Sequence, residues 1–326
     1  MAAWGGNGGK AATAGEKKVD PTAEQPNRYG VEYYRTLFNK RKAAVPQQRM
    51  FLVGKENTMK TGLALYFARN EEEIKAGKMV TIFDIDNSAS ETVNHVYPGD
   101  ENILILPLLD ETDDSIFNED MSVNYPALIE KVTMFINLMA QELKENPDDH
   151  AAIIFDGGST FMKWCENAMT WFLMNRSKNP INVEDGDRFN QAEWRTRNRL
   201  FKDVITRLHA LPIDKVYFTF HLKDDKQFAD LGNGSKGLMK IGEKPDWVDG
   251  TQRLASQQLF MGRYQKKGDS SAGVYADKTL ADGEFAIKAR IEEIKGKGMD
   301  LVGQEKTVLK VKDGKVTFTG IEELRW

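Results

Sequence analysis

The sequence predicts an α/β fold, with a mostly parallel sheet, helices on both of its faces and antiparallel strands added towards the C-terminus. Two observations support this prediction. Between residue 49 and about residue 225, short apolar runs alternate with segments whose apolar residues recur at helical spacing. From about residue 283 the chain instead alternates apolar and polar residues. Strands that alternate with helices form parallel sheets covered on both faces, and such sheets bind ligands beyond the carboxyl ends of their strands.

The elements follow in this order. Apolar runs, several closed by glycine or aspartate, predict strands at 49–54, 78–86, 102–109, 150–158 and 214–225. Helical periodicity predicts helices at 60–77, 125–146, 161–176 and 191–211. In the C-terminal segment, Asp313-Gly314 is a typical two-residue hairpin turn between antiparallel strands. These elements would build one sheet with additional strands at its C-terminal end.

The chain divides into three regions by composition. Residues 1–28 are rich in small residues, Gly and Lys, and we interpret them as a flexible N-terminal arm. Residues 29–282 form the predicted core, within which 226–275 is Gly-rich and Lys-rich with little periodicity and is expected to be a long functional loop. Residues 283–326 are a β-strand extension of the core.

Composition excludes several classes of protein. A formal net charge of -4 gives no global basic field, so any contact with nucleic acid would need a local patch. The one cysteine, Cys165, cannot form an internal disulfide framework, and four histidines without ligand spacing do not predict structural zinc. No apolar run approaches the roughly 18 residues that span a bilayer, so we expect no membrane partner and a cytoplasmic location.

The stretch "FLVGKENTMKTGLAL", residues 51–65, nearly matches the phosphate-binding loop G-x-x-x-x-G-K-[ST] between a strand and a helix. Met59 stands where the second glycine is expected. In such a loop successive backbone N–H groups hold phosphates, the lysine reaches the β- and γ-oxygens and the hydroxyl binds magnesium. The predicted loop residues are Gly54, Lys55, Glu56, Asn57, Thr58, Met59, Lys60, Thr61 and Gly62. We expect ATP and Mg²⁺ as ligands and a loop that still works, because the backbone N–H of Met59 is retained.

Three further strand ends carry polar residues. Asp84 and Asp86 alternate in "IFDIDNS", so they should point to opposite sides of the chain, and either could activate water or cap the next segment. Asp156 ends an apolar strand without a following acidic residue, as in a Walker B element that holds magnesium through water. This favours Asp86 as the base. His221 ends the strand "VYFTFHLKDD", where it could contact the γ-phosphate or be a structural histidine.

Taken together, these motifs resemble the RecA-like ATPase core. They are most similar to the single-domain RecA-like ATPases of phages and archaeal viruses that are linked to single-strand annealing, the AAA-domain phage nucleotide-binding proteins. The resemblance covers residues 49–225. It implies that Lys60 and Thr61 bind ATP and magnesium, that Asp86 is the catalytic base, that Asp156 is the Walker B carboxylate and that His221 is the sensor. It also implies host cytoplasm as the location if the protein is viral.

The same resemblance implies a ring or filament and DNA-contacting loops after the sensor strand. Lys236, Lys240 and Lys244 in "GNGSKGLMK" and its continuation would then meet phosphates of single-stranded DNA, although a charged run is more often a solvated face. Two alternatives stay open. Lys55 directly after Gly54 and the D-x-D strand are similar to ParA/MinD-like ATPase switches, which position DNA or partners. Met59 favours a non-catalytic protein that retained the fold.

Overall fold

The computed structural model describes residues 35, 47–182, 189–230, 236–269, 273–295, 299–319 and 322. The chain divides into two units, residues 1–45 and 46–326, and the fold below is that of the second. The predicted flexible arm, residues 1–28, lies outside the described residues.

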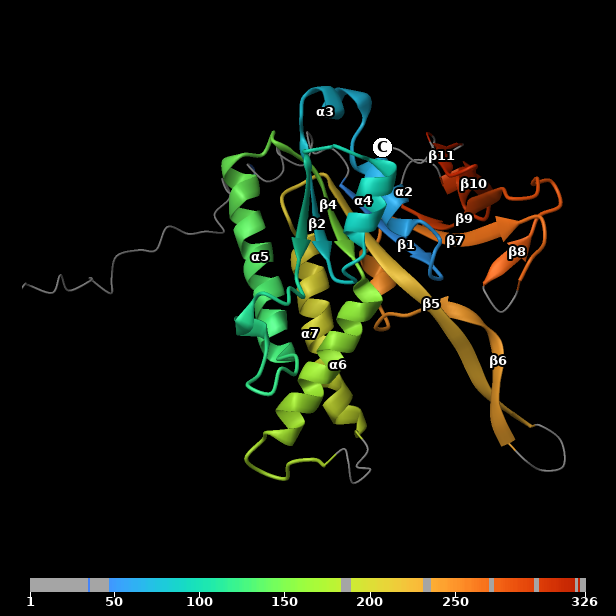
Figure 1. Ribbon diagram of the computed structural model, residues 1–326. Helices are drawn as coiled ribbons and strands as arrows, with labels where there is room; N and C mark the ends of the chain where they lie inside the picture. Colours follow the sequence, from blue (N-terminus) through green and yellow to red (C-terminus); the bar gives the residue numbers. More distant parts are fainter. Residues whose placement is uncertain are drawn as a thin grey trace, which may run out of the picture. The chain divides into compact units, whose positions relative to one another are not determined.

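One sheet of eleven strands is present in the described part of the chain (Figure 1). Its main path runs β11-β10-β9-β7-β1-β5-β4-β2-β3, with β6 paired to β5 and β8 paired to β7. The pairs from β7 through to β3 are parallel, and the pairs among β7, β9, β10 and β11 are antiparallel. The strands are β1 (Gln48–Gly54), β2 (Met79–Asp84), β3 (Ile103–Pro107), β4 (His150–Asp156), β5 (Lys215–Asp230), β6 (Lys236–Pro245), β7 (Gln257–Gln265), β8 (Val274–Ala276), β9 (Phe285–Ile294), β10 (Glu305–Lys312) and β11 (Lys315–Phe318).

The sheet confirms the predicted fold class, α/β with a mostly parallel sheet, helices on both faces and C-terminal antiparallel strands. Asp313 and Gly314 form the predicted turn between β10 and β11, both with positive φ. The helices are α2 (Lys60–Ala68), α3 (Glu71–Lys75), α4 (Ala89–Val96), α5 (Tyr125–Glu145), α6 (Gly158–Met174) and α7 (Gln191–His209), with short 3-10 helices at Asp114–Ile116, Thr251–Leu254 and Met299–Leu301. Within the described residues, none of these helices combines the length and apolar character needed to cross a membrane.

Alternating side chains of the buried strands supply two separate cores. In β1, Phe51 and Val53 pack with α5, α6 and α7 on one face, whereas Met50 and Leu52 pack with α2 and α4 on the other. This follows from the two-residue period of a strand, in which successive side chains point to opposite faces. Figure 1 shows α5, α6 and α7 grouped on one side of the sheet and α2 and α4 on the other. The parallel strands are therefore held rigidly from both faces.

The single helix predicted at 60–77 is wrong in one respect, because the structure divides it. Helix α2 ends at Ala68, and α3 begins after Asn70. The side chain of Asn70 accepts a hydrogen bond from the Glu73 N–H, while the Glu73 carboxylate accepts one from the Asn70 N–H. This reciprocal capping box is a strong helix start. The local hydrogen bonds therefore begin a new helix where the apolar spacing predicts continuation.

The long loop predicted at 226–275 is also wrong, because strands occupy much of this region. β5 continues past its expected end to Asp230 and pairs with β6 as an antiparallel hairpin that extends away from the sheet (Figure 1). β7 then enters the sheet beside β1, with Gly54 opposite Met261. Residues 48–54 and 257–265 are about two hundred positions apart, so local periodicity carries no sign of their pairing. His221 consequently lies inside β5, where the strand leaves the sheet, and not at a strand end.

Candidate active site

The phosphate loop begins where β1 meets its two neighbours, at Gly54. A Cβ on Gly54 would lie 2.6 Å from Oγ1 of Thr58 and 2.9 Å from the carbonyl oxygen of Met261, so only glycine fits here. Oγ1 of Thr58 donates a hydrogen bond to the carbonyl oxygen of Lys55, at 2.8 Å. The loop is therefore a tight turn that is closed by the hydrogen bond of Thr58, and its first residue packs directly against β7.

Met59 adopts the left-handed conformation, with φ 56° and ψ 34°. Left-handed backbone favours glycine, and other residues adopt it at a cost of about 1 kcal/mol. Asn57 in the same loop also has positive φ, 57°. The Met59 side chain packs on the apolar cluster under α2 and α4, and its Cε lies 3.3 Å from where a Cβ on Gly62 would be. The loop thus keeps the backbone shape that glycine usually provides, with a methionine turned onto the core.

Lys60, the first residue of α2, points back into the loop and is 9% exposed. Its Nζ donates to the carbonyl oxygens of Lys55 at 2.8 Å and of Gly54 at 3.3 Å. Burial lowers the pKa of Lys60 to about 8, although Asp156, Asp86 and Glu56 act in the opposite direction. A buried cation with several acceptors close by is a suitable partner for an anionic ligand.

Asp156 at the end of β4 is the centre of a buried hydrogen-bonded group. Its Oδ2 accepts from Oγ1 of Thr61 at 2.7 Å, and its Oδ1 accepts from Oγ1 of Thr219 at 2.6 Å. Burial raises its pKa, and the two hydroxyl hydrogen bonds oppose that rise. Thr61 and Asp156, predicted from separate motifs, are therefore in direct contact. A hydroxyl and a carboxylate are hard oxygen donors of the kind that Mg²⁺ prefers.

These two oxygen donors fit a metal ion whose remaining coordination positions are filled by a bound ligand and water, and not a metal ion that is coordinated by protein alone. Among the described residues, no group of three or more His, Cys, Asp or Glu side chains could hold a metal ion. Magnesium in nucleotide sites commonly uses one or two protein oxygens together with phosphates and water. Thr61 and Asp156 match that pattern.

The two aspartates of β2 and its end have different environments, as their alternation predicts. Oδ1 and Oδ2 of Asp84 accept hydrogen bonds, both 3.1 Å long, from the backbone N–H groups of Ser88 and Ala89, so Asp84 caps α4. Burial raises the pKa of Asp84 to about 6, and these hydrogen bonds oppose the rise. Asp84 is thus a structural residue, and its charged form is disfavoured.

Asp86 instead faces α6 and β5. Its Oδ2 lies 3.6 Å from Nε2 of His221. Burial raises the pKa of Asp86, but polar contacts from His221 and Thr160 outweigh burial, and the net pKa lies below its ordinary value. The carboxylate is therefore ionised at neutral pH, and it is partly buried, with 22% of the side chain exposed, at the same edge as Lys60. An ionised carboxylate with some access to solvent can orient a water molecule and accept its proton.

Two glycines after Asp156 allow this arrangement. Gly157 has φ +103°, and a Cβ there would lie 2.7 Å from the Asp86 carboxylate. A Cβ on Gly158 would lie 2.3 Å from the ring of Phe220. The N–H of Gly157 donates to Oγ1 of Thr219 at 2.8 Å. The start of α6 can therefore approach both Asp86 and β5 closely.

Three functional candidates were missed from the sequence. Thr219 is the polar residue inside the apolar run "VYFTF", a signal that was available. Oγ of Ser159 accepts a hydrogen bond from the backbone N–H of His221 at 2.9 Å and donates one to the carbonyl oxygen of Asp246 at 2.8 Å. Glu243 of β6 pairs with Lys55 at 2.6 Å. The last pair joins the phosphate loop to the hairpin, and no local pattern predicts it.

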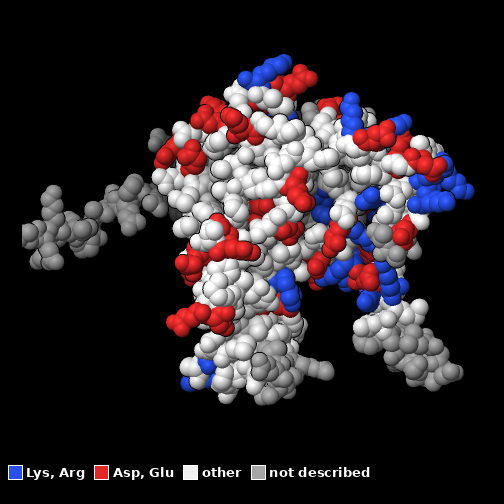
Figure 2. Space-filling view, viewed as in Figure 1, with Lys and Arg blue, Asp and Glu red and all other residues white. Residues whose placement is uncertain are grey.

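The hairpin lysines are less available than the sequence predicts. Lys240 lies 2.6 Å from Asp224 and 3.1 Å from Glu243, and Lys244 lies 2.7 Å from Asp225. The side chain of Lys236 lies outside the described residues. Figure 2 shows Lys and Arg interleaved with Asp and Glu where the hairpin leaves the sheet. The hairpin therefore presents mixed charge and not a basic stripe.

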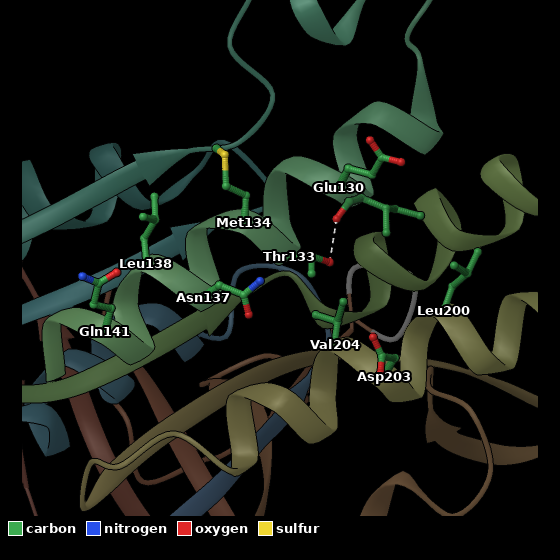
Figure 3. A pocket seen from close by; sticks show the side chains of 10 residues that line it. Glu130, Thr133, Met134, Asn137, Leu138, Gln141, Leu200, Asp203 and Val204 are labelled. Atoms are coloured by element: carbon green, nitrogen blue, oxygen red, sulfur yellow. Dashed lines mark hydrogen bonds between the residues drawn. The ribbon is translucent and has the colours of Figure 1, made fainter. Parts of the chain in front are cut away.

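A groove between α5 and α7 is unrelated to this edge (Figure 3). Its volume is about 510 Å³, and its lining includes Met134 and Leu138 of α5 and Leu200 and Val204 of α7. Thr133 donates to the carbonyl oxygen of Ile129 at 3.0 Å. None of its lining residues belongs to the phosphate loop or to a strand end.

Comparisons with known proteins identify a family for this chain. The model of a family of AAA domains matches residues 46–259, well over half of the chain, and includes all the strand ends described above. The search of curated proteins found no match. Among solved structures, a KaiC-like protein from the hyperthermophilic archaeon Pyrococcus horikoshii OT3 is similar with a TM-score of 0.45 and 10% identity, over 86% of this chain and 93% of that one. On the match to the family model, this chain belongs to the AAA-domain family of P-loop ATPases.

Proposed function

We propose that the chain binds and hydrolyses ATP with Mg²⁺, and that it acts on single-stranded DNA in viral recombination, annealing or replication. The observation that carries the ATPase proposal is the contact between Thr61 and Asp156, beside the buried ammonium of Lys60. Three residues from two separate motifs meet at one sheet edge, as a phosphate site with a metal requires.

Each residue then has a defined task. The N–H groups of the loop and the start of α2 bind phosphate oxygens, and Lys60 exchanges its two backbone acceptors for them. Thr61 and Asp156 would hold Mg²⁺, which supplies Lewis-acid stabilisation of charge on the phosphates. Asp86 orients water and accepts its proton, and His221 holds the Asp86 carboxylate in position.

The hairpin of β5 and β6 is the candidate surface for single-stranded DNA. β5 carries both His221 and one arm of the hairpin, so a change at the sensor can reach the hairpin along a single strand. Lys223 and Lys226 add two exposed cations, although both have acidic neighbours. Self-association into a ring or filament remains part of the proposal.

ATP turnover tests the first part. Wild type should hydrolyse ATP in the presence of Mg²⁺, and Lys60→Ala should abolish turnover while the thermal unfolding transition is retained, because the lost group binds phosphates. Lys163→Ala, an exposed lysine on α6, is the matched control. Equal rates in wild type and folded Lys60→Ala would refute ATP hydrolysis at this loop.

Single-stranded DNA tests the second part. It should stimulate hydrolysis, and alanine at Lys240 and Lys244 should weaken DNA binding and flatten its salt dependence. Absence of binding at low salt, with ATP turnover intact, would favour the ParA/MinD-like switch, whose expected sign is an ATP-dependent dimer. No melting shift with ATP–Mg²⁺ would favour the non-catalytic alternative.

A further inference from the structure

A second cavity lies beside the phosphate loop, between the base of the hairpin and the face of β7 and β9 that points away from α2. Its volume is about 330 Å³. Tyr264 of β7 and Tyr275 of β8 both line it, with ring centroids 5.2 Å apart and planes inclined at 36°. Aromatic rings therefore form one part of the cavity wall.

Gly262 makes room for these two rings. A Cβ on Gly262 would lie 3.0 Å from Cε2 of Tyr264 and 3.1 Å from Cε2 of Tyr275. The backbone of Gly262 lies outside the left-handed region, so its conformation does not require glycine. A larger side chain at position 262 would therefore occupy the space that the two tyrosine rings now use.

Polar groups border the rings on several sides. The Tyr264 hydroxyl donates to Oε2 of Glu305 at 2.7 Å, and Nζ of Lys288 lies 4.5 Å from the Tyr264 ring centroid. Glu243 and Arg290 complete the border. Burial, followed by Glu305, raises the pKa of Tyr264, so its hydroxyl stays a neutral donor. Carboxylates repel phosphate but accept hydrogen bonds from amino groups, which is the pairing that a nucleobase offers.

The cavity adjoins the phosphate loop. Met261, in its wall, touches Gly54 through its carbonyl oxygen. Glu243, also in its wall, holds the ammonium of Lys55 at 2.6 Å. Cδ of Lys55 lies 2.5 Å from where a Cβ on Gly273 would be, just before β8. Lys55 therefore lies between the phosphate loop and the cavity, and a ligand whose phosphates bind the loop can reach the cavity.

We propose that this cavity binds the nucleobase of the nucleotide whose phosphates occupy the loop, with the base packed on Tyr264 and Tyr275. The proposal rests on the proposed function. Aromatic rings contribute to base binding through stacking, and loss of one stacking ring weakens binding measurably. The polar border of Glu243, Glu305 and Lys288 would orient the base, and its two carboxylates would disfavour a second phosphate chain.

The test compares two ligands by isothermal titration: ATP–Mg²⁺ and inorganic tripolyphosphate–Mg²⁺. Tyr264→Leu and Tyr275→Leu should each weaken ATP binding by about tenfold and leave tripolyphosphate binding unchanged, because only the base contact is lost. Gly262→Ala, which retains both rings but displaces them, should have the same selective effect. Tyr125→Leu, at the start of α5, is the matched control and should bind both ligands as wild type does.

The possible outcomes separate this proposal from the ATPase proposal. ATP affinity equal to wild type in both tyrosine variants overturns the nucleobase site but leaves ATP binding intact. A parallel loss of ATP and tripolyphosphate binding also overturns it, because the rings would then only support the loop. Wild type that binds neither ligand refutes the proposed function itself.

Discussion

The two halves of the sheet place their polar side chains in different ways. We call the edge formed by the carboxyl ends of β1, β2, β4 and β5 the phosphate edge. Its functional residues lie at the end of a strand or within a few residues after it: they are Lys60, Asp86 and Asp156. In the C-terminal half, the cavity side chains come from positions along β6, β7, β8, β9 and β10. Parallel strands bring their carboxyl ends to one edge, whereas antiparallel strands place polar residues on a face. The first arrangement leaves a local sequence signal and the second does not.

Loss of Asp156 should have the largest effect in either half. Asp156→Asn retains the shape of the buried group but removes the charge that magnesium needs, so we expect turnover to fall by about a thousandfold and the magnesium requirement to rise. Glu305→Gln, in the C-terminal half, should leave kcat within about threefold. Steady-state ATP hydrolysis over a magnesium titration measures both. A normal magnesium requirement in Asp156→Asn would show that the metal is held elsewhere.

The second comparison is within the phosphate edge, between Asp86 and Asp84. Asp86→Asn should bind ATP–Mg²⁺ as wild type does and lose about a hundredfold in kcat, because an amide cannot accept the proton of water. Asp84→Asn should keep most of its activity, since an amide oxygen still caps α4. Single-turnover hydrolysis together with ATP titration separates binding from chemistry. Equal rates for the two variants would mean that the base lies elsewhere.

The same pair gives a pH prediction with opposite signs. The pKa of Asp84 is about 6 in the folded protein, above its ordinary 3.8. Its contribution to stability is therefore complete below about pH 3.8 and is lost as pH rises through 6. The free energy of unfolding of the Asp84→Asn variant, relative to that of wild type, should therefore rise by about 2 kcal/mol from pH 4 to pH 7, since one pKa unit corresponds to about 1.4 kcal/mol.

Asp86, whose pKa is lowered, behaves in the opposite way: its contribution is present above the ordinary pKa and is lost as pH falls. The free energy of unfolding of the Asp86→Asn variant, relative to that of wild type, should therefore fall as pH rises through the acidic range. Urea unfolding at each pH measures both differences in the free energy of unfolding. A difference that stays constant with pH for Asp84→Asn would contradict the burial argument.

The sequence predicts much of the first half and little of the second. The parallel strands and the fold class follow from apolar runs, because β1, β2 and β4 are buried on both faces. The contact between Thr61 and Asp156 follows from the two motifs, because the phosphate loop after β1 and the end of β4 lie at the same edge of the sheet. The break between α2 and α3 depends on the side chain of Asn70, and the partner of Lys55 depends on a hairpin nearly two hundred residues later. Those outcomes are set by specific hydrogen bonds and tertiary contacts, which periodicity does not contain.

Met59 gives the smallest expected effect and the most direct test of the phosphate loop. Its left-handed backbone costs about 1 kcal/mol, and glycine would remove that cost. Glycine would also lose the contact of the methionine side chain with the cluster under α2 and α4. Because the two changes oppose each other, Met59→Gly should alter the free energy of unfolding by no more than about 1 kcal/mol. Met59→Ala, which loses the contact and keeps the strained backbone, should be the less stable variant.

ATP binding decides what this strain means for function. The backbone N–H of residue 59 is present in wild type and in both variants, and N–H groups of the loop are what bind phosphate. ATP affinity in Met59→Gly should therefore stay within about tenfold of wild type, a change of at most ~1.4 kcal/mol. Titration of ATP–Mg²⁺ into the three proteins measures this. If Met59→Gly binds tightly while wild type and Met59→Ala do not bind, the left-handed residue itself blocks the loop. If Met59→Ala also binds tightly, the methionine side chain is the obstacle.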